Sequence, residues 1–102
     1  MKLVAVTACP SGVAHTYLAA ESLEVAAKSY GVCIHVETQG SIGIENELNA
    51  DEILQADAVI LTTDIGIKNE ERFKGKPVVR VSASDCINKA NGIMKKLIEK
   101  FQ

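Results

Sequence analysis

The sequence predicts an α/β fold: a three-layer α/β/α sandwich around a parallel sheet of four strands. Four short apolar runs, at residues 3–7, 32–38, 58–61 and 78–81, alternate with segments of helical periodicity. The first and third runs are almost continuously apolar, which is typical of parallel strands buried on both faces. Alternating strands and helices favour a doubly wound sheet with right-handed crossovers.

Length and composition predict one domain spanning residues 1–102. The chain has 102 residues, of which 47% are hydrophobic, and a formal net charge of -2. This charge gives no basic surface for nucleic acid. No apolar run approaches the roughly 20 residues of a membrane span, and no signal peptide is recognisable, so we expect a cytoplasmic protein. The three cysteines form no C-x-x-C pair, so neither disulfides nor a metal site are expected.

The first half of the chain predicts two strands joined by a long helix. After the strand at 3–7, apolar residues recur every three or four positions from Val13 to Tyr30, and Gly31 supplies the helix stop. The next run, 32–38, alternates apolar and polar residues, which indicates a strand near a sheet edge. His35 lies on its polar face and is interpreted as a surface histidine.

The second half predicts short elements around two further strands. Asn49 and Glu52 have the spacing of a helix cap, so a short helix is expected to end near Ala56. Residues 69–72 fit one helical turn whose charges face solvent. After the strand at 78–81, the run Ser82-Ala83-Ser84-Asp85 offers N-cap residues for one last helix running toward Phe101.

Cys9 stands between the first strand and the first helix, and the candidate site is centred on it. A helix N-terminus exposes unpaired amides and partial positive charge, which favour a thiolate and a bound phosphate. We therefore expect a reactive Cys9 with a pKa below the ~8.5 of an unperturbed cysteine. The alternative is an inert core thiol, the interpretation adopted for Cys33 and Cys86. The expected phosphate-binding loop comprises Pro10, Ser11, Gly12, Val13, Ala14, His15 and Thr16.

The identity of the residue at position 15 bears on the reaction. Cysteine-dependent phosphatases carry an arginine at the position that His15 occupies here, where its planar fork grips the phosphoryl group under attack by water. Histidine supports hydrolysis poorly, yet the loop could hold a phosphoryl group on Cys9 and transfer that group to an acceptor. A low-molecular-weight cysteine phosphatase and a phosphate-binding module remain alternatives. Asp64 or Asp85 would be the general acid of a phosphatase, although such residues more often cap turns.

Residues 9–21 closely resemble the active-site signature of fructose-family enzyme IIB components of the bacterial sugar phosphotransferase system (PTS), and residues 37–43 resemble that family's second motif. The resemblance implies a phosphocysteine carrier that needs no cofactor. Cys9 would accept a phosphoryl group from phosphohistidine of a IIA partner. It would then pass the group to fructose or a related sugar bound by the membrane-embedded IIC partner. Ser11 and Leu18 depart mildly from the signature and keep its chemistry.

The resemblance also implies the strand order 2-1-3-4, with the first strand central. In such a sheet the loops that follow the strands gather at one edge, where ligands bind. Gln39, Gly40 and Ser41 follow the second strand, and the resemblance places them at the rim of the site. Asp64 follows the third strand and is a further candidate for this rim.

Overall fold

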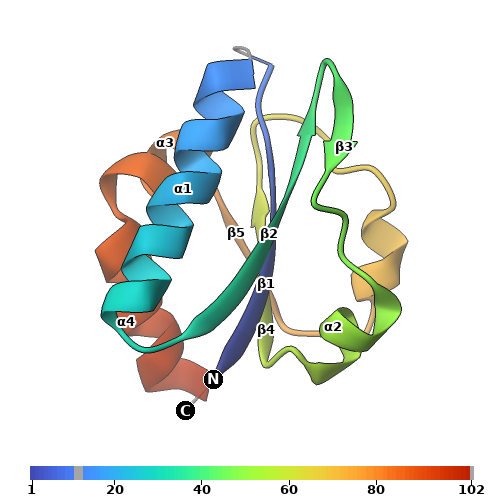
Figure 1. Cartoon of the computed structure of the whole chain (residues 1–102). Helices are drawn as coiled ribbons and strands as arrows, with labels where there is room; N and C mark the ends of the chain where they lie inside the picture. The colour runs from blue at the N-terminus through green and yellow to red at the C-terminus, as the bar shows by residue number, and fades with distance from the viewer. Residues whose placement is uncertain (11–12, 102) are drawn as a thin grey trace.

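The computed structural model describes residues 1–10 and 13–101, and in this part of the chain five strands form one mixed sheet (Figure 1). The strands, in the spatial order β3-β2-β1-β4-β5, are β3 (Gly43–Glu45), β2 (Cys33–Gly40), β1 (Lys2–Ala8), β4 (Ala58–Thr62) and β5 (Val78–Val81). β2, β1, β4 and β5 are parallel neighbours. The predicted parallel strands and their order 2-1-3-4 are therefore confirmed.

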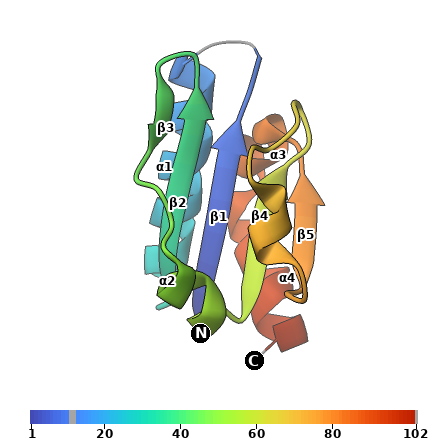
Figure 2. The ribbon, with the colours of Figure 1, turned by 90° about the vertical axis from the view of Figure 1, so that its right-hand side faces the viewer.

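Helices cover both faces of this sheet, which confirms the three layers. α1 (Val13–Ser29), α3 (Ala83–Asn88) and α4 (Ala90–Phe101) lie on one face (Figure 1). The other face carries the smaller α2 (Ala50–Gln55) and the 3-10 helix η1 (Glu70–Phe73), which are in front of the sheet in Figure 2. None of the helices in the described residues has the length and apolarity needed to cross a membrane.

The fifth strand, β3, was not predicted from the sequence. β2 runs on to Gly40, turns through Ser41 and Ile42, and β3 returns antiparallel beside it. Gly43 has a φ of 110°, which a residue with a side chain rarely adopts, so glycine permits the return. The expected glycine-rich connection is therefore a hairpin. A tight turn suffices for antiparallel strands, whereas parallel neighbours need a long crossover.

The single last helix expected after Ser82 was also wrong, because α3 and α4 are separate helices. Of the four residues expected to supply the cap, Ser82 is the one that caps α3, its hydroxyl oxygen accepting a bond from the Asp85 amide at 3.0 Å. Lys89 then departs from helical geometry, with φ -127° and ψ 24°. The break redirects the chain, and both helices bury apolar residues, including Cys86 of α3 and Met94 of α4.

Alternation along the central strand divides the apolar core between the two faces. Leu3 and Ala5 belong to the core beneath α1, α3 and α4, where Leu23 is fully buried. Val4 and Val6 belong to the second core, together with Phe73 of η1. Successive side chains of a strand point to opposite faces, so β1 anchors both layers.

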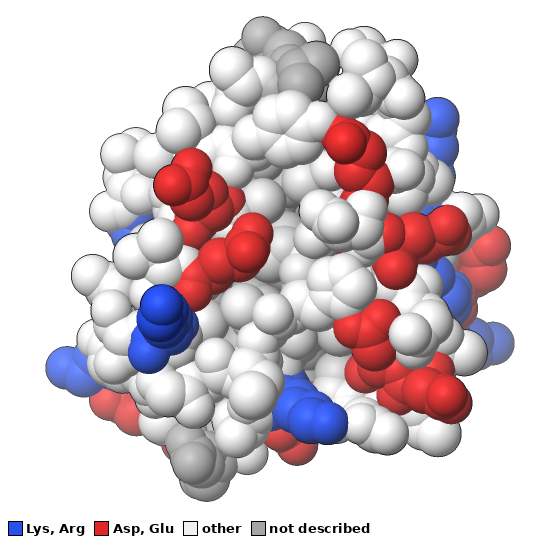
Figure 3. Space-filling view, in the orientation of Figure 1, with Lys and Arg blue, Asp and Glu red and all other residues white. Residues whose placement is uncertain are grey.

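Charges of both signs share the surface seen in Figure 3. Acidic side chains spread over the middle of this face, and basic side chains lie toward its margins. An exposed ion pair joins Arg80 to Glu70 at 2.9 Å, and a weaker one joins Lys89 to Asp85 at 3.9 Å. This face therefore offers no continuous basic surface of the kind that binds nucleic acid.

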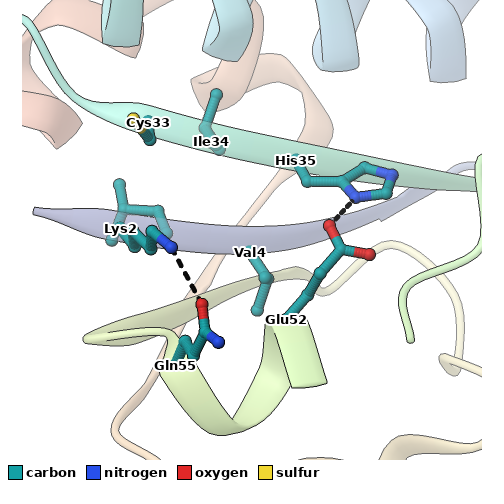
Figure 4. A pocket seen from close by; sticks show the side chains of 8 residues that line it. Lys2, Val4, Cys33, Ile34, His35, Glu52 and Gln55 are labelled. Carbon is teal, nitrogen blue, oxygen red and sulfur yellow. Dashed lines mark hydrogen bonds and ion pairs between the residues drawn. The ribbon is translucent and has the colours of Figure 1, made fainter. Parts of the chain in front are cut away.

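His35 has a defined partner, so it is not simply a surface histidine. Its Nδ1 pairs with a carboxylate oxygen of Glu52 across a hollow near the amino ends of the strands (Figure 4). Glu52 also completes the predicted capping box: its amide donates to Asn49 Oδ1 at 2.8 Å, and its carboxylate accepts from the Asn49 amide at 3.3 Å. The hydrogen bond with His35 holds the pKa of Glu52 below its usual value. The pair thus joins β2 to the first turn of α2.

We expect Asn49→Ala to lower the free energy of unfolding by about 1 kcal/mol, because the amide of Glu52 loses its side-chain acceptor. Asn49→Ser keeps an acceptor oxygen and should lose much less. Urea denaturation of the two variants measures the difference. Equal losses in both would show that the cap does not stabilise α2.

Candidate functional site

Cys9 lies directly beyond the carboxyl end of β1 and four positions before α1 begins at Val13. Its side chain is nearly buried, with 9% of the residue exposed. The Cys9 Sγ lies 2.9 Å from Nδ1 of His15, which belongs to the first turn of α1. Of the expected phosphate-binding loop, Ser11 and Gly12 lie outside the described residues. A sulfur beside an imidazole, facing a helix start, is an arrangement that activates thiols.

Two buried threonines hold the chain on either side of this thiol. Thr62, at the end of β4, accepts a bond from the Ala8 amide at 2.9 Å and donates one to the Ala8 carbonyl at 3.0 Å. Thr7 donates from its hydroxyl to the carbonyl of Thr16 at 3.1 Å, which ties β1 to the first turns of α1. These three bonds restrain the backbone next to Cys9, so the position of its sulfur is set by the sheet and by the helix.

A hollow of about 300 Å³ opens beside Cys9 at this edge of the sheet. Its wall is built from the end of β1 and the residue after Cys9, from the β2–β3 hairpin, and from the segment that follows β4. The residues are Ala8, Cys9, Pro10, Gln39, Gly40, Ser41, Gly43, Ile44, Ile65, Gly66 and Lys68. The structure thus brings three expected rim residues, Gln39, Gly40 and Ser41, to the hollow that contains Cys9.

Asp64, the fourth expected rim residue, has a different place. It is not among the residues that line this hollow. Its Oδ1 accepts a hydrogen bond of 2.7 Å from the amide of Ala83, the first residue of α3. Asp64 therefore caps the start of a helix, whereas the alternative left open by the sequence was the cap of a turn.

The side chain of Gln39 is fully used in holding the wall of the hollow. Its Nε2 donates to the Lys68 carbonyl at 3.0 Å and to the carboxylate of Glu37 at 2.8 Å. Its Oε1 accepts from the Lys68 amide at 2.8 Å. Two bonds to one residue fix the segment after β4 against β2. Gln39 therefore stabilises the wall of the hollow, and both polar atoms of its side chain already have hydrogen-bond partners.

Beneath Gln39 lies a buried ion pair that the sequence did not predict. Arg72 donates from both terminal nitrogens to Glu37, at 2.8 and 2.6 Å, and the Glu37 side chain is fully buried. Burial alone would raise the pKa of Glu37. Hydrogen bonds from Arg72, Gln39 and the Leu48 amide outweigh this effect and hold the pKa below its usual value. The expectation that the charges at 69–72 simply face solvent was wrong for Arg72.

Sequence reasoning missed the roles of Arg72 and Lys68 in this region, and it did not predict that Glu37 is buried. One signal was available, since Glu37 is a charged residue within an apolar strand pattern and buried carboxylates need a cation. No local pattern marks its partner, which lies 35 positions away. Lys68 reaches the hollow only because the segment after β4 folds back against β2.

The chain matches known proteins over nearly its whole length. Residues 4–99 match the family model described as "PTS system, Lactose/Cellobiose specific IIB subunit". A curated relative from Escherichia coli strain K12, "PTS system fructose-like EIIB component 2", is 65% identical over 96 residues, covering 94% of this chain and 91% of the relative. The chain is a fructose-like IIB component of the PTS.

Solved structures of IIB domains have the same fold. A domain of a fructose-specific IIABC component from Borrelia burgdorferi superimposes with a TM-score of 0.87 at 56% identity, covering 93% of this chain and 90% of that one. An enzyme IIB subunit from Escherichia coli K12 gives 0.91 at 40% identity, covering 97% and 92%. This IIB component therefore belongs to a phosphotransferase family, as the signature around Cys9 predicted.

The buried pair predicts a specific pattern of stability. Arg72→Met leaves the Glu37 carboxylate buried without its cation and should lower the free energy of unfolding by about 3 kcal/mol at pH 7. Arg80→Met removes an exposed pair and should change it little. Denaturant titrations test both, and a loss for Arg80→Met as large as that for Arg72→Met would contradict the assignment.

The same pair predicts how stability depends on pH. The pKa of Glu37 is lower in the folded chain than the reference value of 4.5. The contribution of the pair is therefore complete above about that pH and is lost as pH falls below it toward the folded-state pKa. Glu37→Gln cannot titrate, so its stability deficit relative to the unmodified chain should shrink between pH 5 and pH 3. A constant deficit would exclude this linkage.

The cysteines should differ in alkylation. Burial raises the pKa of Cys86 to about 12, so this thiol should resist iodoacetamide in the folded chain. Cys33 is exposed, contrary to the structural role expected from its strand, and serves as the accessible reference. Cys9 should react at lower pH than Cys33, with a midpoint below ~8.5. Mass spectrometry of labelled peptides across pH measures each rate. Identical pH profiles for Cys9 and Cys33 would exclude activation.

Proposed function

We propose that this IIB component is a phosphocysteine carrier, with Cys9 as the residue that is phosphorylated. The observation that carries the proposal is the 2.9 Å contact between Cys9 Sγ and His15 Nδ1 in front of α1. An imidazole N–H and the helix N-terminus each favour the thiolate over the thiol. The thiolate is the nucleophile that phosphoryl transfer requires.

In the first transfer, the Cys9 thiolate attacks the phosphorus of phosphohistidine on a IIA partner. The S–P bond forms as the P–N bond breaks, and the electron pair of the broken bond leaves with the imidazole nitrogen of the donor. The first-turn amides of α1, including those of Ala14 and His15, have no carbonyl partner within the helix, and in this scheme they are the donors that bind the phosphoryl oxygens. Transfer of this kind depends mainly on alignment and charge stabilisation.

In the second transfer, a hydroxyl oxygen of fructose or a related sugar, held by the membrane IIC partner, attacks the phosphorus of phosphocysteine. The S–P bond breaks, the thiolate returns to its initial state, and the hydroxyl proton passes to a base. A curated relative named "Fructose-like PTS system EIIBC component" carries the B and C designations in one protein and is 46% identical to this chain over 99 residues. That relationship supports a IIC partner.

The placement of the arginines argues against the phosphatase alternative. Arg72 and Arg80 are the only arginines of the sequence. Arg72 is bound to the buried Glu37, and Arg80 is paired with Glu70. Neither lines the hollow beside Cys9. Both guanidinium groups are therefore bound to carboxylates and do not line the hollow, so neither is placed to hold a phosphoryl group during hydrolysis.

We predict that the protein gains one phosphoryl group on Cys9 when it is incubated with a phosphorylated IIA-type donor. Cys9→Ser should lose the label, because the serine hydroxyl is not ionised at neutral pH as an activated thiol is. Intact-mass and peptide mass spectrometry locate the group. Cys33→Ser is the matched control and should be labelled normally.

A label on His15 or His35, retained in Cys9→Ser, would overturn the carrier mechanism. Rapid turnover of an aryl phosphate by the unmodified protein would favour the phosphatase instead. A true carrier should hold the phosphoryl group and release little inorganic phosphate until an acceptor is added.

A further inference from the structure

Lys68 stands out at the hollow beside Cys9. Among the described residues that line this hollow, it is the only one with a charged side chain. It is exposed, and it forms no ion pair with any carboxylate within residues 1–10 and 13–101. Its positive charge is therefore not neutralised by a close partner within that part of the chain.

The backbone of Lys68 is held firmly at this place. The Gln39 side chain accepts from its amide at 2.8 Å and donates to its carbonyl at 3.0 Å, which is a two-point attachment to β2. Gln39 is itself held by Glu37, whose charge is balanced by Arg72. The charges of Glu37 and Arg72 balance each other below the wall, whereas the charge of Lys68 at its surface has no such partner among the described residues.

The positive charge of Lys68 matters for an anionic ligand because the chain as a whole is negatively charged. The chain carries a net charge of -2, and acidic side chains spread over the face shown in Figure 3. Glu45, at the end of the β2–β3 hairpin, pairs with the hydroxyl of Tyr17, so a carboxylate lies between the hairpin and α1. A phosphoryl group with two negative charges is repelled by a chain of net negative charge, and a cation that lines the hollow offsets part of this repulsion.

We propose that Lys68 is the cation that draws the phosphoryl group to Cys9 and lowers the repulsion around it, with Gln39 and the Glu37–Arg72 pair as the residues that position it. This inference rests on the proposed function and names a binding residue for that site. The ligand class is a phosphoryl or other small oxyanion entering beside the Cys9 sulfur. The contribution of Lys68 is electrostatic, so it falls with added salt.

Two alkylating agents of similar shape test the charge without using the phosphotransfer reaction. Iodoacetate is an anion and iodoacetamide is neutral, so the ratio of their rates at Cys9 reports the local potential. Lys68→Met should lower this ratio about threefold at low ionic strength, the order of effect expected for one unit charge in the same water-exposed hollow. Lys68→Arg should restore the ratio, and 1 M salt should remove the difference between the variants.

Two controls separate a local from a general effect. Lys74→Met removes the same charge from an exposed position that lines a different hollow, with Val78 at the start of β5, and should leave the Cys9 ratio unchanged. Cys33 in each variant provides an internal reference. Gln39→Met keeps the net charge and deletes both bonds to Lys68, so a lowered ratio in this variant supports the positioning role, and an unchanged ratio overturns it.

An unchanged ratio at Cys9 in Lys68→Met would overturn the inference even if Cys9 accepts phosphate from a donor protein. The carrier function would then stand without it. A lowered ratio, together with slower labelling of Lys68→Met by the phosphorylated donor, supports it. Because alkylation does not require phosphotransfer, failure of Cys9 to accept phosphate would overturn the proposed function and leave the electrostatic result to be judged separately.

Discussion

The buried ion pair between Glu37 and Arg72 is the interaction on which the open edge of the site depends. It joins β2 to η1 beside the second apolar core, to which Phe73 of η1 belongs. Its cost is the removal of two charges from water, and it is favourable only when every remaining polar atom of the carboxylate finds a partner. The Leu48 amide and Gln39 supply those partners. The pair therefore orders three segments at once.

The other side of the site is rigid for a different reason. Cys9 follows the central strand, which is packed on both faces and bonded to β2 and β4 along its length. Thr62 and Thr7 add hydrogen bonds from side chains where the strand ends and α1 begins. A nucleophile on such a support keeps its position, while a wall made of hairpin and loop is built around it.

This division of the site follows from the topology of the sheet. Parallel strands end at the same edge, so the segments after β1, β2 and β4 meet there. β3 extends that edge, because the hairpin turns Gly40, Ser41 and Gly43 toward the hollow rather than away from the sheet. Without this hairpin the hollow would lose the part of its wall that Gly40, Ser41 and Gly43 supply.

Sequence alone determined the parallel strands and their spacing, the start and stop of α1, the cap at Asn49, a further cap within residues 82–85, and the place of Cys9. All of these depend on residues near one another in the chain: strand patterns, capping residues and a glycine at the end of a helix. Only the tertiary structure decided that Glu37 is buried on Arg72, that Lys68 lies at the mouth of the hollow and that Asp64 caps α3. These contacts join residues 19 to 35 positions apart. Such pairs leave no periodic signal, because the energy that selects them appears only when the packed chain removes their charges and dipoles from water.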